Sequence, residues 1–513
     1  MKFLLDTNVV VKIEDNHQVD EAFSTLVRKL QEHHLSVYID QAVREDVQRD
    51  KDEVRRAITL SKLDKFESLR PAHQSLVDRL IEQTGAPLRP NDENDIRLLA
   101  SIAGNAADFL ITEDLGLHRR ARRAELSERV VTVSEAVKFV SRMFDATEIA
   151  LPYIKEIKAY QIDRSDKIFQ TLREDYGGFD KWFEEKCAKE HRDCWIIEDG
   201  VNIAGILIPK SESQKDTTAK SKAEKILKIC TFKLQPEYRG EKFGEQLLKK
   251  ALWHAQTNQF ELVYLTAFEK HAALINLIER FGFKKTYRNE RGEDVFEKEI
   301  LHSEILLPDK IDALQFDRLI YPRFVETAQI RKFVIPIRPE YHKVLFPEIS
   351  YAAPLPLFGL TRQDLLTRKG KSDRTPGNAI RKIYLCHSNN TNLRSGDIIL
   401  FYQSKNEEFA NSQSVTTLGI VETVQIFTEI GSLSSHVAKR SVFSTEELRA
   451  LLKRGPRVKA IDFLLVGHFD PPIKLNHLLE TGVFRNRAPM SILQIDDRHY
   501  EIIKRQSRLA YGY

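Results

Sequence analysis

Carboxylate side chains recur in the N-terminal part of the chain, at places where the pattern predicts the end of a strand or the beginning of a helix. These acids are Asp6, Asp40, Glu45, Asp95 and Asp114. Carboxylates that converge at one edge of a parallel sheet repel one another, and a hard cation such as Mg²⁺ or Mn²⁺ relieves that repulsion. A metal ion held in this way can activate water and neutralise charge on a phosphodiester. The acids therefore predict metal-dependent phosphodiester hydrolysis.

The elements that would position these acids predict a parallel sheet covered by helices. Short apolar runs at 3–5, 35–39 and 109–111 are typical of strands that are buried on both faces. Apolar residues at helical spacing between these runs predict the connecting helices. Simpler roles stay open, because Asp95 can stabilise a helix N-terminus and Glu45 can be a solvated helix acid.

The same residues resemble those of PIN-domain ribonucleases. The resemblance rests on Asp6-Thr7-Asn8, the helix with Glu45, Asp95 with Ala100, and the run at 107–114. In that family, four acids in this order hold one or two Mg²⁺ or Mn²⁺ ions. The resemblance implies a PIN-like α/β/α nuclease domain over 1–146, with Thr7 and Asn8 supporting the ligands. Its catalytic and metal-binding residues would be Asp6, Glu45, Asp95 and Asp114.

The PIN resemblance also implies RNA as the substrate and, for toxin-type members, an antitoxin protein as a partner. Four arginines follow the last acid on a predicted helix. They are Arg119, Arg120, Arg122 and Arg123. Cations at these positions either hold RNA phosphates or form a solvated basic face, and the sequence leaves both roles open.

In the middle of the chain, a glycine-containing turn lies between a predicted strand at 226–234 and a predicted helix. Backbone N–H groups at such a turn attract an anion, and the helix dipole adds to this attraction. A pyrophosphate group is therefore the expected ligand. The run at 239–244 resembles the acetyl-CoA loop of GNAT acetyltransferases, and Phe281-Gly282-Phe283 resembles the end of that family's closing helix. The resemblance implies a GNAT-like α+β domain over 150–300. Its cofactor, acetyl-CoA, would be bound by Tyr238, Arg239, Gly240, Lys242, Phe243 and Gly244.

Two residues depart from the GNAT pattern. Lys242 stands where the family usually has glycine, and Ile278 stands where it commonly has a tyrosine that acts as general acid. Isoleucine cannot donate a proton. The domain is therefore either an enzyme that uses water or another residue, or a CoA-binding or structural module. Upstream, the polar stretch 209–225 predicts a mobile insertion.

The C-terminal part predicts a small β-barrel, because short strands alternate with turn residues. Strands are expected at 333–337, 380–388, 398–404, 416–424, 463–469 and 492–495. The sequence segments at 382–388 and 396–402 resemble those of PUA-like domains of the ASCH and EVE type. This resemblance implies RNA or modified-base binding. This domain is expected over 329–513, after a linker at 301–328. A basic loop at 368–374 and Tyr402 could both bind RNA. The other interpretation, which the sequence leaves open, is that the loop is simply solvated and that Tyr402 is a core residue.

Composition narrows the class of protein. The chain has 513 residues, and at roughly 150 residues per domain this length predicts three domains. A net charge of +4 with 30% charged residues argues against a general polyanion binder. Four scattered cysteines favour a reducing compartment. No apolar run approaches the roughly 20 residues that a membrane span needs, so we expect a cytoplasmic protein without a membrane partner.

Together, these features predict a multidomain α/β protein. The leading hypothesis is a metal-dependent endoribonuclease that the C-terminal domain directs to tRNA or another structured RNA, and the sequence leaves open whether it is of the toxin type. One alternative is an N-acetyltransferase that acts on a protein or aminoacyl-tRNA amine. Another is a non-catalytic regulator that senses RNA or CoA.

Overall fold

The protein divides into two compact units. The computed structural model describes residues 1–513 except 14–20, 50–51, 88, 145–153, 200–201, 236–237, 239–241, 304, 348, 350–378, 407–411, 438–444 and 512–513. The first unit consists of Met1–Thr147, Phe427–Lys439 and Phe443–Arg457. The second consists of Glu148–Ile426, Arg440–Val442 and Val458–Tyr513. The second unit thus contains the expected domain at 150–300 and most, but not all, of the expected domain at 329–513. The domain boundaries stay a prediction.

The first unit contains the expected parallel sheet, with the strand order β3-β2-β1-β4-β5. Its strands are β1 (Lys2–Leu5), β2 (Ser36–Ile39), β3 (Glu67–Ser68), β4 (Phe109–Ile111) and β5 (Val130–Val131). All four pairings are parallel. Because Leu5 lies opposite both Ile39 and Ile111, the residues that follow these three strands reach the same edge of the sheet.

Helices connect these strands. They are α1 (Thr7–Ile13), α2 (Glu21–Glu32), α3 (Gln41–Gln48), α4 (Glu53–Leu63), α5 (Gln74–Thr84), α6 (Pro90–Ala103), α7 (Leu115–Arg123) and α8 (Val133–Phe144). Two helices from later in the chain, α17 (Ile430–Val437) and α18 (Thr445–Arg454), belong to the same unit. The sequence did not predict that this unit draws on two distant parts of the chain.

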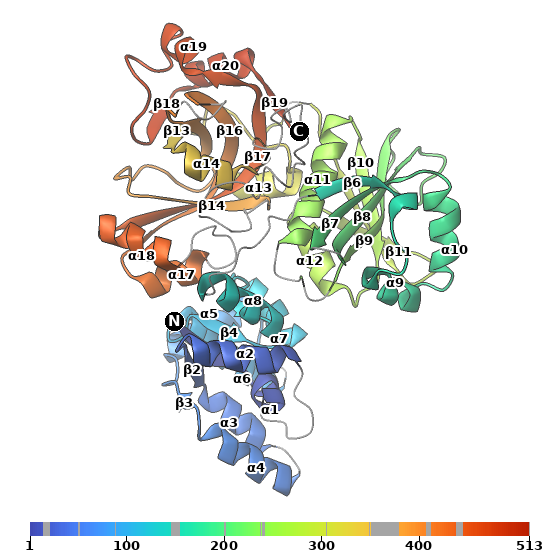
Figure 1. The fold of residues 1–513 in the computed structure, drawn as a ribbon, viewed down its shortest axis with the longest axis vertical. Helices are drawn as coiled ribbons and strands as arrows, with labels where there is room; N and C mark the ends of the chain where they lie inside the picture. The colour runs from blue at the N-terminus through green and yellow to red at the C-terminus, as the bar shows by residue number, and fades with distance from the viewer. Residues whose placement is uncertain are drawn as a thin grey trace, which may run out of the picture. The chain divides into compact units, whose positions relative to one another are not determined.

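The second unit begins with a mixed sheet in the order β11-β12-β10-β9-β8-β7-β6. Its strands are β6 (Ile154–Lys158), β7 (Asp193–Asp199), β8 (Asn202–Glu212), β9 (Ile226–Leu234), β10 (Leu262–Ala267), β11 (Lys284–Arg288) and β12 (Asp294–Glu299). Helices α11 (Phe243–Thr257) and α12 (Ala272–Arg280) lie on one side of this sheet, and α9 (Gln170–Asp175) and α10 (Phe179–Phe183) lie on the other (Figure 1). Among the described strands of this sheet, only β9 and β10 pair in parallel.

The prediction of a mobile insertion at 209–225 is wrong for its first residues. Strand β8 continues to Glu212, which lies opposite Ile226 of β9. The side chain of Glu212 is buried and accepts hydrogen bonds from Tyr264 Oη at 2.5 Å and from Lys210 Nζ at 2.8 Å. These hydrogen bonds stabilise the buried carboxylate of Glu212, so that a stretch of polar composition can still form an ordered strand.

The second sheet of this unit has the order β14-β17-β16-β15-β13-β18, and β19 also pairs with β17. Its strands are β13 (Lys332–Ile337), β14 (Arg381–Cys386), β15 (Ile398–Gln403), β16 (Ser414–Phe427), β17 (Val458–Lys474), β18 (Leu493–Ile495) and β19 (Arg508–Ala510). The helices around it are α13 (Ala313–Ile320), α14 (Pro339–Leu345), α19 (Leu475–Glu480) and α20 (Asp497–Gln506). The pairings of the described strands do not form a closed ring, so the expected barrel is not present among them. The predicted basic loop at 368–374 lies outside the described residues.

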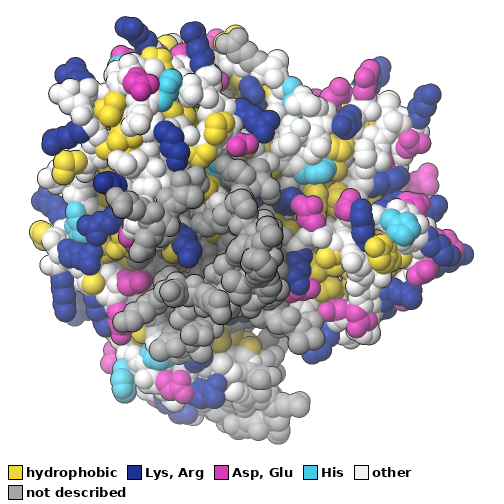
Figure 2. Space-filling model, turned by 45° about the horizontal axis from the view of Figure 1, so that its top comes forward, with side chains coloured by type: hydrophobic (Ala, Val, Ile, Leu, Met, Phe, Trp, Pro, Cys, Tyr) yellow, Lys and Arg dark blue, Asp and Glu magenta, His cyan; other side chains and the backbone are white. Residues whose placement is uncertain are grey.

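The two sheets of the second unit share one hydrophobic core. Twelve of the fifteen residues of α11 are buried, which means that this helix is covered on more than its sheet-facing side. Trp253 Nε1 donates a hydrogen bond to Tyr321 Oη at 2.9 Å, and Tyr321 Oη donates to the carbonyl of Leu465 at 2.9 Å. Helix α11 therefore connects the two sheets. On the face shown in Figure 2, Lys and Arg side chains are interspersed with Asp and Glu, as a net charge of only +4 implies.

Candidate functional site

Three of the four predicted acids come together at the edge of the parallel sheet. Burial raises the pKa of Asp6 to about 6, and the charge of Asp114 adds to this effect. Burial likewise raises the pKa of Asp95 to about 7, with further contributions from Asp114 and Asp6. Asp6 and Asp95 thus resist ionisation because they are buried and other carboxylates are near.

Polar neighbours hold Asp6 in place. Its carboxylate accepts hydrogen bonds from Thr112 Oγ1 at 2.6 Å, Asn8 Nδ2 at 2.7 Å and the backbone N–H of Thr7 at 2.7 Å. Asp114 accepts from the backbone N–H of Leu117 at 2.9 Å, as the N-cap of α7. The oxygens of Asp6 are therefore already occupied by neutral donors.

Glu45 does not lie where the predicted ligand set needs it. It accepts a hydrogen bond from Arg97 Nη1 at 2.5 Å, and this contact lowers the pKa of Glu45. The next residue, Asp46, faces the site instead, because it accepts from Thr7 Oγ1 at 3.0 Å and from Asn94. Successive residues of a helix point about 100° apart, so only one of the two acids can face Asp6. Sequence reasoning missed Asp46 although it is adjacent to the residue that was chosen.

The predicted metal site is not supported. Among the residues that the structure describes, no group of three or more His, Cys, Asp and Glu side chains could hold a metal ion. The hydrogen bonds to Asp6 and the ion pair of Glu45 explain why the set does not fit Mg²⁺ or Mn²⁺ as it stands.

Two of the predicted RNA-binding arginines make contacts within the first unit. Arg120 lies 3.5 Å from Asp92, and Arg123 donates to the carbonyl of Thr84 at 2.9 Å. These contacts fix α7 against the end of α5 and the first turn of α6. They favour a packing role for these two side chains over phosphate binding.

The predicted acetyl-CoA loop leads into α11. Arg239 and Gly240 lie outside the described residues. Lys242 precedes α11 with φ = 64°, a left-handed conformation that glycine adopts more easily, which gives a physical reason why glycine is usual at this position. Tyr238 stacks on Phe243 with ring centroids 5.8 Å apart, and Gly244 follows in the first turn of the helix.

Next to this loop, the two parallel strands of the sheet separate. Strands β9 and β10 pair from Ile226 opposite Leu262 to Ile229 opposite Leu265. Beyond this point β9 pairs only with β8, and β10 pairs only with β12, among the described strands. Backbone N–H and C=O groups of β9 that would face β10 are then available to an extended ligand with amide groups. The N-terminus of α11 and the separated strands fit acetyl-CoA.

A buried carboxylate lies beside the point of separation. Glu293 Oε1 accepts hydrogen bonds from Thr266 Oγ1 at 3.2 Å and from Tyr176 Oη at 3.1 Å. Glu293 Oε2 accepts from Asn289 Nδ2 at 3.0 Å. Sequence reasoning missed this group, because Tyr176 and Glu293 are 117 residues apart in the chain.

Comparison with known families decides what the middle of the chain is. A family model described as the acetyltransferase (GNAT) family matches residues 157–283. These residues form a GNAT acetyltransferase domain. The match supports the GNAT resemblance of the sequence, and the comparisons do not support the PIN resemblance. No curated protein matches the chain.

Solved structures with similarity to parts of the chain have low TM-scores. An ASCH protein from Zymomonas mobilis has 14% identity and a TM-score of 0.24, over 35% of this chain and 96% of that chain. The PaiA N-acetyltransferase from Thermoplasma acidophilum in complex with coenzyme A has 15% identity and a TM-score of 0.23, over 29% and 98%. NAA60 from Arabidopsis thaliana in complex with a bisubstrate analogue has 16% identity and a TM-score of 0.24, over 29% and 100%. Similarities at this level carry no argument about function.

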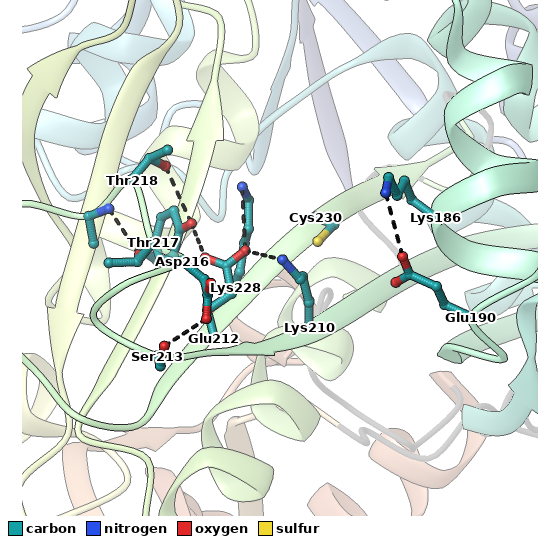
Figure 3. A network of polar contacts seen from close by, with 12 residues as sticks. Lys186, Glu190, Lys210, Glu212, Ser213, Asp216, Thr217, Thr218, Lys228 and Cys230 are labelled. Carbon is teal, nitrogen blue, oxygen red and sulfur yellow. Dashed lines mark hydrogen bonds and ion pairs between the residues drawn. The ribbon is translucent and has the colours of Figure 1, made fainter.

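Within the GNAT domain, a charged network lies on β8 and β9, close to the separated strands. Figure 3 shows Glu212 between Lys210 and Lys228, at 2.8 Å and 3.9 Å. Cys230 lies on β9 beyond this network, at a residue that the register between β8 and β9 skips. Arg192 Nη1 lies 3.7 Å from Cys230 Sγ. Burial raises the pKa of the Cys230 thiol, which disfavours a reactive thiolate.

Ile278 of the GNAT domain is fully buried in α12. Its apolar side chain packs in the core and has no proton to donate to a leaving thiolate. Ile278, which stands where the GNAT family commonly has a tyrosine, thus has a packing role in α12. In addition, none of the described helices is long and apolar enough to span a bilayer.

Proposed function

We propose that the GNAT domain transfers the acetyl group of acetyl-CoA to a primary amine. The observation that carries this proposal is the separation of β9 and β10 beside the loop that opens α11, inside the matched residues 157–283. The N-terminus of α11 offers backbone N–H groups and a favourable dipole to the pyrophosphate. Lys242, at the start of the helix, adds a positive charge there.

The bound cofactor supplies a thioester, which is an acetyl donor with a stable thiolate as its leaving group. The residues of the chain hold it in place. Cys230–Leu234, the part of β9 beyond its pairing with β10, offers backbone hydrogen bonds along an extended ligand. Helix α11 packs on one side of the sheet, and the proposal places the acceptor amine on the other side, on which α9 and α10 also lie. The acceptor stays open between a protein amine and an aminoacyl-tRNA amine.

The test measures acetyl-CoA binding and amine acetylation separately. Calorimetry with the full chain should show binding of acetyl-CoA, and labelled acetyl-CoA should acetylate at least one amine from a panel. The panel contains a peptide with a free α-amine, a blocked peptide with one lysine, and aminoacyl-tRNA. The variant Lys242→Glu should bind acetyl-CoA at least tenfold more weakly, because it brings a negative charge to the pyrophosphate.

Lys215→Glu is the matched control, since Lys215 is an exposed side chain on a turn of the same domain. It should bind acetyl-CoA as the wild type does. Equal binding by the wild type and Lys242→Glu, or a wild type that binds acetyl-CoA but acetylates no amine of the panel, would contradict the proposal.

Ribonuclease activity of the first unit is a second candidate function. The observation in its favour is the clustering of Asp6, Asp95 and Asp114, which raises the pKa values of Asp6 and Asp95. The test incubates the full chain with total cellular RNA in Mg²⁺ or Mn²⁺, without acetyl-CoA, beside the variants Asp6→Asn and Glu45→Gln. Cleavage that Asp6→Asn abolishes and Glu45→Gln retains would support this function, whereas intact RNA in all reactions would exclude it.

A further inference from the structure

We infer that Glu293 accepts the proton of the acceptor amine in the GNAT domain, and that Tyr176 is its positioning residue. This inference rests on the acetyl transfer proposed above. It assigns the proton transfer to a carboxylate that lies outside the matched residues 157–283, on the turn before β12.

The position of the reacting group follows from the strands. Parallel pairing of β9 and β10 ends at Leu265, and the next residue of β10 is Thr266. A ligand that extends along the unpaired part of β9 therefore brings its thioester close to Thr266. The hydroxyl of Thr266 donates a hydrogen bond to Glu293 at 3.2 Å. The carboxylate of Glu293 therefore lies next to the expected position of the thioester, with only the side chain of Thr266 between them.

Glu293 and Thr266 lie on the face of the sheet that is opposite to α11. Leu265 and Ala267 belong to the same core cluster as Leu247 and Leu248 of α11. Successive side chains of a strand point to opposite faces, so Thr266 points away from α11. Glu293 contacts Thr266 and therefore lies on that opposite face, where the proposed function places the acceptor.

The surroundings of Glu293 favour a cationic ligand. The residue is only 4% exposed, and its three side-chain partners, Thr266, Tyr176 and Asn289, are neutral donors. In the described part of the chain, no Lys, Arg or His forms an ion pair with it. A buried carboxylate without a counter-charge is costly, and an ammonium group bound beside it would remove that cost.

Other charged groups nearby are already engaged or lie on the same turn. Asp175 pairs with Lys270 at 2.5 Å and with His271 at 3.7 Å. Arg291 lies on the turn of Glu293 and acts on Tyr176 through its charge. Burial and the charge of Glu293 raise the pKa of Tyr176, so its phenol stays protonated and keeps donating to the carboxylate.

The proposed step conserves atoms and charge. The acceptor enters as an ammonium group paired with Glu293 and gives one proton to the carboxylate. The free amine then attacks the acetyl carbon, so that a C–N bond forms and the C–S bond to coenzyme A breaks. Glu293 releases this first proton to solvent and is ionised again, so that it can accept the second proton from the nitrogen once the C–N bond has formed and can release it in turn. The leaving thiolate takes up one proton from solvent, since Ile278 has none to give, and one proton is released overall. The products are the acetylated amine and free coenzyme A.

The experiment compares Glu293→Gln with the wild type in the full chain. Glu293→Gln keeps the shape of the side chain and should lower kcat by about 10²–10⁴-fold, the usual contribution of a general base. Its Kd for acetyl-CoA should be unchanged, which also shows that the domain is folded. Glu293→Asp should recover part of the rate. The acidic limb of the pH profile of kcat/KM should disappear in Glu293→Gln.

Tyr176→Phe separates positioning from a structural role. It removes a donor that stabilises the ionised carboxylate, so the acidic limb of the kcat/KM profile should move to higher pH while acetyl-CoA binding is retained. Glu269→Gln is the control, because Glu269 has a side chain that is 83% exposed in the same domain. It should behave as the wild type.

The possible failures can be told apart. A wild type that binds acetyl-CoA and acetylates no amine overturns both the proposed function and this inference. A wild type that acetylates an amine, together with a Glu293→Gln variant of equal kcat, overturns only the assignment of Glu293. If Glu293→Gln does not fold, a Glu293→Asp variant that binds acetyl-CoA with an unchanged pH profile overturns the assignment in the same way.

Discussion

Glu245 Oε1 accepts the backbone N–H of Arg381 at 2.7 Å. Glu245 lies in the first turn of α11, directly after the predicted acetyl-CoA loop, and Arg381 begins β14 of the other sheet. The opposite carboxylate oxygen lies 3.8 Å from Lys242 Nζ. The side chain of Arg381 in turn contacts the buried Glu422. The start of α11 is thus held by a strand of the C-terminal part.

Glu245→Ala should destabilise the second unit and weaken acetyl-CoA binding together. The substitution leaves the N–H of Arg381 without its acceptor, which costs ~1–3 kcal/mol, and it removes the carboxylate that lies 3.8 Å from Lys242 Nζ. The midpoint of urea unfolding and the Kd for acetyl-CoA measure the two effects. Glu269→Ala, at an exposed position, should change neither. An unchanged Kd in Glu245→Ala would show that the contact has no influence on the loop.

Tyr321→Phe should lower the stability of the second unit by ~1–3 kcal/mol. The hydroxyl of Tyr321 is fully buried and connects Trp253 Nε1 with the carbonyl of Leu465. Its loss leaves a buried donor and a buried acceptor unpaired. Tyr160→Phe, at a residue that is 56% exposed, is the control. Urea unfolding followed by tryptophan fluorescence measures the difference, and equal midpoints for both variants would contradict the role of this bridge.

Gly282→Ala should be much more damaging than Gly292→Ala. Both glycines have positive φ values, 85° and 79°, which cost an L-residue about 1–2 kcal/mol. A Cβ at Gly282 would in addition lie 2.0 Å from the carbonyl oxygen of Leu319, whereas a Cβ at Gly292 meets nothing within 4 Å. Gly292→Ala should therefore fold with a modest loss. Comparable unfolding midpoints for the two variants would contradict the close approach at Leu319.

The first unit should lose stability as the pH rises through the range in which Asp6 titrates. Burial raises the pKa of Asp6 from 3.8 to about 6, so the folded state binds a proton more tightly than the unfolded state between these values. Stability is then fully present below pH 3.8 and is lost as the pH rises to about 6. Asparagine at this position cannot ionise. In Asp6→Asn, the pH-dependent decrease in the free energy of unfolding, on the order of 1–3 kcal/mol in the wild type, should therefore be absent.

Urea unfolding at several pH values between 4 and 8, monitored on the first unit by hydrogen exchange, measures this slope. Asp78→Asn is the control, because Asp78 is an exposed acid on α5 of the same unit. It should leave the slope unchanged. A wild-type stability that rises over this pH range, with no change in Asp6→Asn, would contradict the raised pKa of Asp6.

Local sequence patterns predicted much of the secondary structure. The apolar run at 109–111 is strand β4, and the segment at 35–39 contains β2, because short runs rich in apolar and β-branched residues and bounded by turns favour strands. The strand and helix around Gly244 were predicted for the same reason, and the GNAT match agrees with them. By contrast, polar composition misled the prediction for 209–225, since burial of Glu212 depends on partners that lie elsewhere in the chain.

The sequence by itself determined the parallel sheet, the GNAT domain and the edge of the sheet to which Asp6 comes, because these depend on hydrophobic periodicity and short motifs. Only the tertiary structure decided that Asp46 rather than Glu45 faces Asp6, and that Tyr176 and Thr266 meet at Glu293. It also decided that α11 is buried between two sheets. The direction of a side chain and the partner of a charge depend on how distant elements pack, and neighbours in the sequence do not carry that information.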